Sequence, residues 1–290
     1  MRSYIFPIIS ILTLGTASLS AADIYLADSN SDSPPEDWNT LSEWNTASDG
    51  TGVAPGSISA SDDYFINSFT LRTPDASATF GGNSLSIDGN GALLIRHLNG
   101  NASTVNDLVL GGGYLNAGRA FQQTINAVNV SSTAFTRLTA LSDRGITFNI
   151  TNLTGNSVIK FGDASNETGL YQISIANATG FTGELQSVRG TTDFQNDVNL
   201  GNASWFLNEN VMTGVVLDQS ITFSAVDFAG AGNLGAGTYS ASDLNTFATT
   251  TKFSGGGQLT IIPEPSSYSL GIALIALASS FATRRFGRKS

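Results

Sequence analysis

Short stretches in which every second residue is apolar recur through the middle of this chain. Side chains two residues apart lie on the same face of a β-strand, so each stretch predicts a strand with one apolar face. No window of about a dozen residues between 23 and 262 keeps a helical stripe, and this part is predicted to be all-β. The clearest stretches are Leu85/Ile87, Leu93/Ile95, Leu108/Leu110, Val128/Val130, Ile146/Phe148/Ile150, Tyr171/Ile173/Ile175, Val198/Leu200 and Ile221/Phe223.

Turn-forming residues separate the expected strands. Glycine and asparagine accept the positive φ angles that tight turns need, and they gather at 81–83, 88–91, 99–101, 111–113 and 154–156. Many short strands joined by such turns favour an irregular right-handed parallel β-helix, a solenoid in which each turn buries its inward residues on the next. The uneven spacing between strands leaves an antiparallel β-sandwich as the alternative.

The N-terminal end of this β-rich part differs from its middle. Residues 23–74 contain Trp38 and Trp44 and most of the prolines. A solenoid needs such a segment as a cap, because the backbone groups of an uncovered first turn would pair with another chain. An exposed tryptophan pair could instead stack on sugar rings, so Trp38 and Trp44 are also candidates for a glycan site.

Residues 205–262 are predicted to form a terminal β unit that caps the other end. Ser240 followed by Asp243 resembles a capping box that opens a short helix. Leu244 and Phe247 would lie on the inner side of that helix. Strands are expected at 205–207, 215–217 and 221–223, and a last one within 255–261.

The first residues have the composition of a secretory signal peptide. Arg2 supplies one positive charge, residues 4–14 are mainly apolar, and Ser20-Ala21-Ala22 offers a small-residue cleavage site. We therefore expect export, with residues 1–22 removed.

The last residues combine three features in order. Pro263-Glu264-Pro265 precedes an apolar segment over 268–283, and a basic end over 284–290 begins at Arg284 and Arg285. As a helix, the apolar segment from 268 to 282 would span about 22 Å, which is less than the roughly 30 Å of a hydrocarbon core. It is thus expected to be a short transmembrane helix whose basic end stays in the cytoplasm.

This order resembles the PEP-CTERM sorting signal of exported proteins in certain Gram-negative bacteria. The resemblance implies that an exosortase, a transpeptidase-like membrane enzyme, reads Pro263, Glu264, Pro265, Arg284 and Arg285. It also implies secretion machinery as a partner, a transient inner-membrane intermediate, and a final place on the outer surface or in the extracellular matrix.

Short segments such as Gly145–Ile150 and Ile173–Ala178 are similar to the passenger regions of autotransporter-like surface proteins.

The expected organisation is a signal peptide (1–22), an N-terminal capping segment (23–74), a β-solenoid body (75–204), a C-terminal β unit (205–262) and a PEP-CTERM tail (263–290).

The chain is acidic, with 13 basic and 23 acidic residues and a formal net charge of −10. Without the two terminal segments these counts fall to 8 and 22, which leaves about −14 on residues 23–262. Such a body is repelled by phosphate, so nucleic acid is not expected as a partner. The absence of cysteine excludes thiol catalysis and zinc–thiolate sites. The single histidine, His97, is predicted to be a polar residue at a strand end.

The segment from Asp28 to Asp32 is the best candidate for metal binding. Asp28, Asn30 and Asp32 place oxygen ligands at alternating positions, as a calcium loop does. Ser33 and Asn39 stand where an EF-hand would have glycine and glutamate, so that pattern fails twice. No cofactor is expected, and calcium remains open.

No catalytic motif stands out in the sequence. The main hypothesis is therefore an exported, non-catalytic surface or matrix protein with a structural or adhesive role linked to exopolysaccharide and biofilm. There are two alternatives. One is a polysaccharide-degrading β-helix enzyme (a lyase or hydrolase) that would use some of the scattered acidic residues. The other is a calcium-dependent glycan-binding module.

Overall fold

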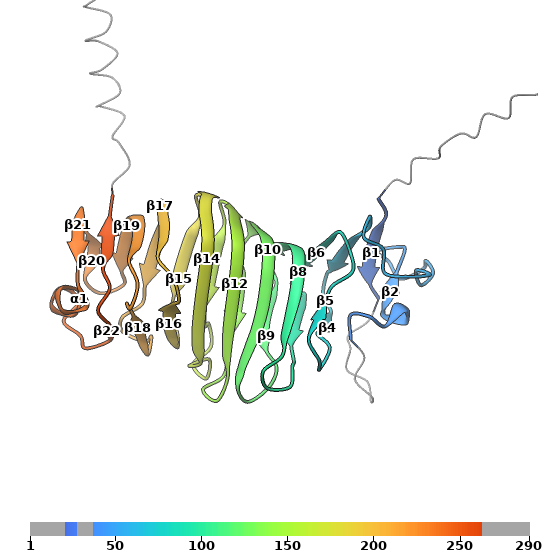
Figure 1. Cartoon of the computed structure of the whole chain (residues 1–290), viewed down its shortest axis with the longest axis horizontal. Coiled ribbons are helices and arrows are strands. Elements are labelled where there is room, and N and C mark those ends of the chain that lie inside the picture. Colours follow the sequence, from blue (N-terminus) through green and yellow to red (C-terminus); the bar gives the residue numbers. More distant parts are fainter. Residues whose placement is uncertain (1–20, 28–36, 263–290) are drawn as a thin grey trace, which may run out of the picture.

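The computed structural model describes residues 21–27 and 37–262, and these form a coiled stack of parallel strands (Figure 1). Strands make up 53% and helices 4% of the structure, and the chain winds through about 7 turns. The prediction of an all-β parallel solenoid is confirmed, and the antiparallel sandwich is not adopted.

Two long sheets form the walls of the solenoid. The first, sheet A, contains in spatial order β2 (Trp44–Asn45), β1 (Asp23–Leu26), β3 (Asp63–Ile66), β6 (Ser84–Asp88), β8 (Ala102–Gly111), β10 (Gln122–Ala134), β12 (Gly145–Gly155), β14 (Leu170–Phe181), β16 (Thr191–Phe194), β18 (Gly214–Val216) and β22 (Phe253–Ser254), with β5 (Ala78–Thr79) beside β8. The second, sheet B, contains β4 (Thr70–Arg72), β7 (Ala92–Ile95), β9 (Tyr114–Ala117), β11 (Thr136–Thr139), β13 (Val158–Phe161), β15 (Glu184–Ser187), β17 (Val198–Leu207), β19 (Ile221–Phe228), β23 (Leu259–Ile261) and β21 (Gly237–Tyr239), with β20 (Gly232–Leu234) beside β19.

The strand pairing is parallel throughout the middle of the body. Each strand bonds to the strand one turn before it and one turn after it, as β12 bonds to β10 and β14. Among the described residues, antiparallel strand pairs occur between β1 and β2, β19 and β20, and β21 and β23, and a single antiparallel bridge joins Asp88 to Gly112. These pairs lie at the two ends, where they turn the sheet edges away from a further parallel strand.

Apolar side chains stack in columns inside the coil. One column contains Leu85, Leu108, Val130 and Leu153, which pair in register on β6, β8, β10 and β12. Each of the four is at most 1% exposed. Because a residue on one turn covers its counterparts on the turns before and after it, the column holds the turns together by burial of apolar surface.

The long strands bend at a corner that their sequence pattern does not mark. In β10 the alternation breaks at Val128 and Asn129, which both face outward, and inward positions resume at Val130. The expectation that Val128 and Val130 share a face is therefore wrong: Val128 is 41% exposed and Val130 is 1% exposed. Two successive outward residues at the bend let one strand serve two faces of the solenoid.

Gly155 shows why glycine ends one of these strands. It has φ of 103°, a conformation that other residues rarely adopt. A Cβ atom there would lie 2.2 Å from the carbonyl oxygen of Ser132 on the preceding turn. Glycine is thus required both by the turn after β12 and by the close approach of the neighbouring coil.

The N-terminal end is closed by an aromatic cluster. Trp38 and Trp44 are fully buried and pack against Phe80 and Tyr64, with ring centroids 5.4 Å apart for Trp38–Phe80 and 4.9 Å for Trp44–Tyr64. The Trp44 indole N–H donates to the carbonyl oxygen of Trp38 at 3.0 Å. This packing agrees with the predicted cap.

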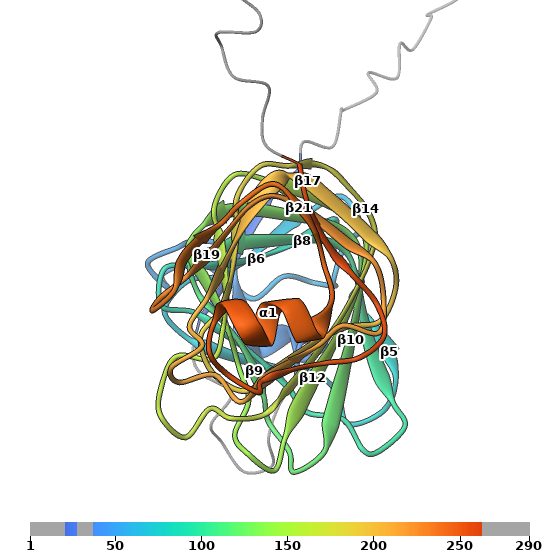
Figure 2. The ribbon, with the colours of Figure 1, turned by 90° about the vertical axis from the view of Figure 1, so that its left-hand side faces the viewer.

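The C-terminal end is closed by helix α1 (Ala241–Phe247), which lies across the opening of the coil (Figure 2). The predicted capping box is confirmed, because Ser240 accepts from the Asp243 N–H and the Asp243 carboxylate accepts from the Ser240 N–H. Leu244 is fully buried as expected. Phe247 packs on Phe228, with ring centroids 5.3 Å apart, but its side chain is only partly on the inner side, since it is 36% exposed.

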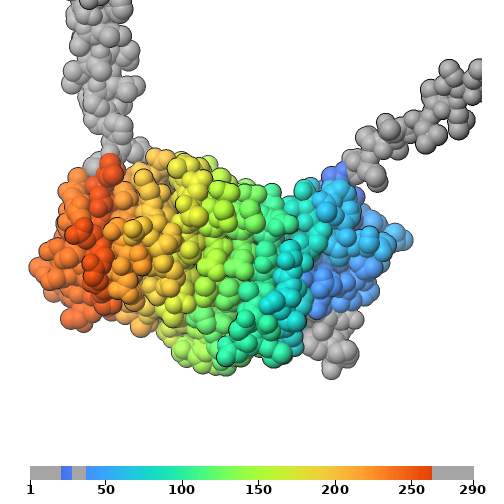
Figure 3. All heavy atoms as spheres, in the orientation of Figure 1, coloured from blue at the N-terminus to red at the C-terminus, as the bar shows by residue number. Residues whose placement is uncertain are grey.

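The body is continuous from β1 to β23. Both sheets continue across the predicted boundaries at residues 74/75 and 204/205. β3 and β4 therefore already belong to a turn of the solenoid, and residues 205–207 are the end of β17. Figure 3 shows the same order on the surface, where successive turns follow one another along the long axis.

Two valines on β10 provide a matched test of the corner. Val130→Ala should lower the free energy of unfolding by roughly 1–3 kcal/mol, because it removes buried methyl groups and leaves a cavity. Val128→Ala should change it by less than about 0.5 kcal/mol, as for other exposed sites. Urea unfolding of both variants measures the difference, and equal effects would contradict the outward placement of Val128.

Candidate functional site

A ladder of polar side chains runs along the corner where the long strands bend. Asp107, Asn129, Asn152 and Asn177 occupy equivalent positions on β8, β10, β12 and β14. Asn177 donates from its amide nitrogen to Asn152 Oδ1 at 3.2 Å, and Asn152 donates in the same way to Asn129 Oδ1 at 3.1 Å. We call these four residues the corner ladder.

An open groove lies beside the N-terminal half of the corner ladder. It has a volume of about 540 Å³ and crosses the outer face of β3, β6, β8, β10 and β12. This size falls within the range of small-molecule sites, which is roughly 300–1,000 Å³. Its lining combines carboxylates, amides, hydroxyl groups and one aromatic ring: Asp63, Asp107, Asn83, Asn129, Asn152, Ser84, Ser86 and Phe65 are among the residues involved.

The two carboxylates of the groove have different surroundings. Asp63 accepts hydrogen bonds from Asn83 Nδ2 at 2.9 Å and Ser84 Oγ at 2.6 Å. Asp107 has no hydrogen-bond partner among the described residues, and partial burial, aided by the negative charge of Asp63, raises its pKa above the usual value. The proton is therefore held more tightly on Asp107 than on an exposed aspartate.

An aromatic pair forms the N-terminal end of the groove. Phe65 on β3 stacks on Tyr25 of β1, with ring centroids 5.3 Å apart and planes inclined by 24°. Both side chains are half-buried on the outer face, unlike the tryptophans of the cap. Because Tyr25 supports one face of Phe65, the ring has a defined orientation without the cost of ordering it on binding.

Basic residues gather on the opposite wall, over sheet B. Arg137 lies over the rings of Phe135 and Tyr114, with its guanidinium carbon 4.5 and 5.1 Å from their centroids. Asp163 accepts from Lys160 and forms an ion pair with Arg137 at 3.2 Å. The hydrogen bond from Lys160 and the two positive charges lower the pKa of Asp163. These charges are largely paired with one another.

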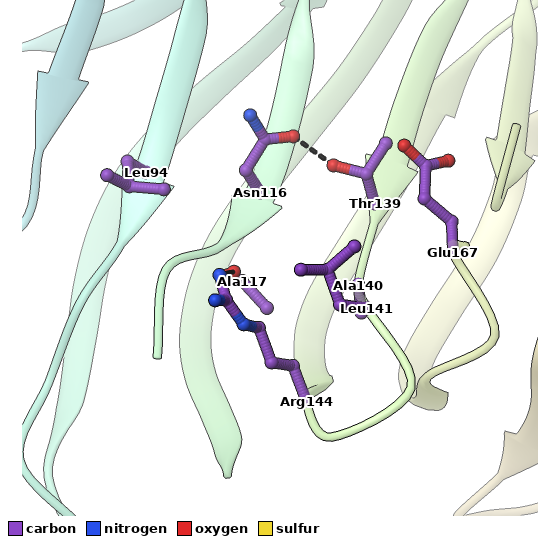
Figure 4. A pocket seen from close by; sticks show the side chains of 8 residues that line it. All are labelled: Leu94, Asn116, Ala117, Thr139, Ala140, Leu141, Arg144 and Glu167. Atoms are coloured by element: carbon purple, nitrogen blue, oxygen red, sulfur yellow. Dashed lines mark hydrogen bonds between the residues drawn. The ribbon is translucent and has the colours of Figure 1, made fainter. Parts of the chain in front are cut away.

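A smaller cavity of about 190 Å³ lies at the edge of sheet B (Figure 4). Arg144 and Glu167 reach it from separate loops, and Asn116 on β9 accepts a hydrogen bond from Thr139 on β11 between them. The Arg144 side chain donates to the Ala117 carbonyl oxygen at 3.1 Å, and Glu167 accepts from the backbone N–H groups of residues 163 and 164. Both ionisable groups thus support loops, and the cavity is smaller than a usual ligand site.

His97 is a buried structural residue. Its side chain is 1% exposed, and its Nδ1 and Nε2 atoms lie 3.3 and 2.9 Å from the carbonyl oxygens of Pro74 and Thr124. Its backbone N–H donates to Gln123 Oε1 at 2.7 Å. The histidine lies two residues beyond β7, as the strand-end prediction requires, but its full burial was not foreseen. Burial lowers its pKa, and the two carbonyl groups oppose that effect in part.

The sequence candidates for glycan stacking, Trp38 and Trp44, do not form such a site. Both indoles are fully buried in the cap, so no sugar ring reaches them. The aromatic pair on the outer face at this end is instead Tyr25 and Phe65, which are half-buried and which no sequence motif marks. Asp28, Asn30 and Asp32, the proposed calcium ligands, lie outside the described residues.

The sorting residues Pro263, Glu264, Pro265, Arg284 and Arg285 also lie outside the described part of the chain. Within residues 21–27 and 37–262, no helix is long and apolar enough to cross a membrane. In the same residues, no three histidine or acidic side chains come together in the way a metal site would need.

The lowered pKa of buried His97 implies that the stability of the fold depends on pH. Since its pKa is lower in the folded than in the unfolded chain, where it is about 6.5, the folded state binds the proton less well. Its contribution to stability is present above pH 6.5 and is lost as the pH falls through the lowered folded pKa. Urea unfolding between pH 7.5 and 5 should therefore show a steeper loss for the natural protein than for His97→Gln. A constant difference between the two would contradict this.

Comparison with known proteins gives this chain no relative, since no protein-family model, no curated protein and no solved structure matches it.

Proposed function

We propose that this protein is an exported, non-catalytic component of the cell surface or extracellular matrix, with a structural or adhesive role linked to exopolysaccharide. An exosortase sorts it through Pro263, Glu264, Pro265 and the basic end. The N-terminal and C-terminal segments of the sequence support the location outside the cell. The capped β-solenoid supports the structural or adhesive role.

The observation that carries the role is the capped solenoid with a polar groove along its outside. Within the described residues, aromatic packing closes one end and α1 closes the other, and the strands at the sheet ends are only two or three residues long, so the body is a rod with little exposed edge. Its interior is a mainly apolar core, and the polar groups that a polymer could reach lie on the outer faces. A rod of this kind offers a long, fixed surface to a polymer.

The ionisable groups of the body mostly support the fold. Asp75 pairs with Arg119 at 2.5 Å, and Asp163 serves both Arg137 and Lys160. Ser103, which donates from its backbone N–H to His97 Nε2, is fully buried, so this serine and histidine are closed to a polymeric substrate. These arrangements favour a scaffold over a hydrolase built around His97.

One observation favours a second candidate, a glycoside hydrolase. Asp63 and Asp107 line the same groove on strands two apart, which places their backbones about 9–10 Å from one another. Inverting glycosidases hold two carboxyl groups roughly 6.5–9.5 Å apart, with the pKa of the acid raised. The raised pKa of Asp107 fits the acid of such a pair.

Release of reducing ends from polysaccharide decides between the two candidates. We expect the purified full chain to release none above background from an uncharged β-glucan over one day, with Asp107→Asn giving the same result. Release by the natural protein that Asp107→Asn abolishes would replace the scaffold with the hydrolase.

Tail processing tests the sorting. In a bacterium that encodes an exosortase, we expect the mature extracellular protein to lack residues after the Pro263–Pro265 motif, as read by intact-mass measurement. Glu264→Ala should leave the full-length form in the inner-membrane fraction, as should loss of the exosortase. The control Asp218→Ala changes an exposed acidic residue of the body and should be processed normally. Normal processing of Glu264→Ala would contradict the proposal.

A further inference from the structure

The hydrogen bonds of the corner ladder end within the groove, at Asn129. They run from Asn177 to Asn152 and from Asn152 to Asn129, each amide donating toward the N-terminal end. No hydrogen bond joins Asn129 to Asp107 in the described part of the chain, although the two residues pair in register. The Asn129 side-chain N–H groups and the Asp107 carboxylate are therefore left without side-chain partners, next to each other in the groove.

This pair of groups matches the chemistry of a sugar hydroxyl. A hydroxyl group donates one hydrogen bond and accepts others, so it can bond to Asp107 and receive a bond from Asn129 together. Ser84 on β6 adds a hydroxyl group, which donates to Asp63 and can still accept a hydrogen bond from a ligand. Asp63 and Asp107 make the groove negative, which repels a polymer that carries carboxylates on its units.

Phe65 supplies an apolar surface at one end of the groove. Sugar rings have a face of C–H groups that packs on an aromatic ring, and Tyr25 fixes the ring from behind. The groove thus combines a flat apolar platform with nearby polar groups that set orientation, as binding sites for polar organic ligands do.

The groove is also long enough for a chain of sugars. It crosses five neighbouring strands from β3 to β12, and four spacings of about 4.8 Å give a length of about 19 Å along the solenoid axis. Most turns along the groove contribute a polar side chain, from Asp63 on β3 to Asn152 on β12, so a polymer meets polar groups along its length.

We infer that this groove binds an uncharged polysaccharide, which lies along the solenoid axis with one sugar ring on Phe65 and its hydroxyl groups bonded to Asn129 and Asp107. The inference rests on the proposed function, which it makes specific by naming the class of glycan and its site.

Affinity measurements with the full chain, purified in mild detergent, test the site. The probes are a soluble uncharged β-glucan, alginate, which carries a carboxylate on every unit, and chitosan, which is cationic at pH 6. We expect saturable binding of the β-glucan and none of alginate. Phe65→Ala and Asn129→Ala should each weaken binding roughly ten-fold, which corresponds to the loss of one or two net interactions.

Two matched controls separate the groove from the rest of the surface. Asn177→Ala removes an asparagine of the same ladder that does not line the groove, and Phe135→Ala removes a half-buried aromatic ring on the opposite wall. Both should bind the β-glucan as the natural protein does. Unfolding midpoints of all four variants identify any that fail through loss of stability.

Several results would overturn the inference. These are absence of β-glucan binding, equal binding by the groove variants and the natural protein, and tighter binding of chitosan, which would indicate attraction of cations by Asp63 and Asp107. Failure here with normal tail processing removes only the glycan site, whereas failed processing with intact β-glucan binding removes only the sorting.

Discussion

Stacking of inward apolar side chains between successive turns is the interaction on which this structure depends. A single turn cannot bury its apolar face, because that face is covered only by the turns on either side. The column of Leu85, Leu108, Val130 and Leu153 illustrates the arrangement, with each residue sealed by its neighbours in register. The first and last turns lack a neighbour on one side, so their apolar faces must be covered by caps.

The caps meet this demand in different ways. At the N-terminal end, Trp38 and Trp44 fill the opening with large rings that pack on Tyr64 and Phe80. At the other end a short helix lies across the coil and inserts Leu244. At each end, antiparallel pairing also finishes one of the two sheets, which interrupts the parallel edge that would otherwise recruit another chain. Both caps bury the apolar face of an end turn, one with aromatic rings and the other with a helix.

The sequence predicts the architecture well because strand alternation and turn residues are local. The inward pairs, the glycine at residue 155 and the capping box at Ser240 are all readable over a few residues. The corner at Val128 and Asn129 is not, because it depends on where the strand meets the next face and not on local composition. The groove was missed for the same reason: Asn129 and Asn152 are 23 residues apart and meet only when the turns stack. Recurrence of asparagine at steps of 23 and 25 residues is a signal in the sequence that points to the ladder.

The corner connects the fold to the proposed binding surface. Two outward residues in succession are needed for a long strand to change face, and the second of them occupies the corner-ladder position on β8, β10 and β12. Because that position contributes nothing to the core, its chemistry is free to vary without loss of the coil. Asparagine there bonds to asparagine on the next turn, whereas Asp107 ends the series and leaves polar groups available in the groove. The ladder therefore has one part in which the amides satisfy each other, from Asn129 to Asn177, and one part in which Asn129 and Asp107 keep polar groups that can bond to a ligand.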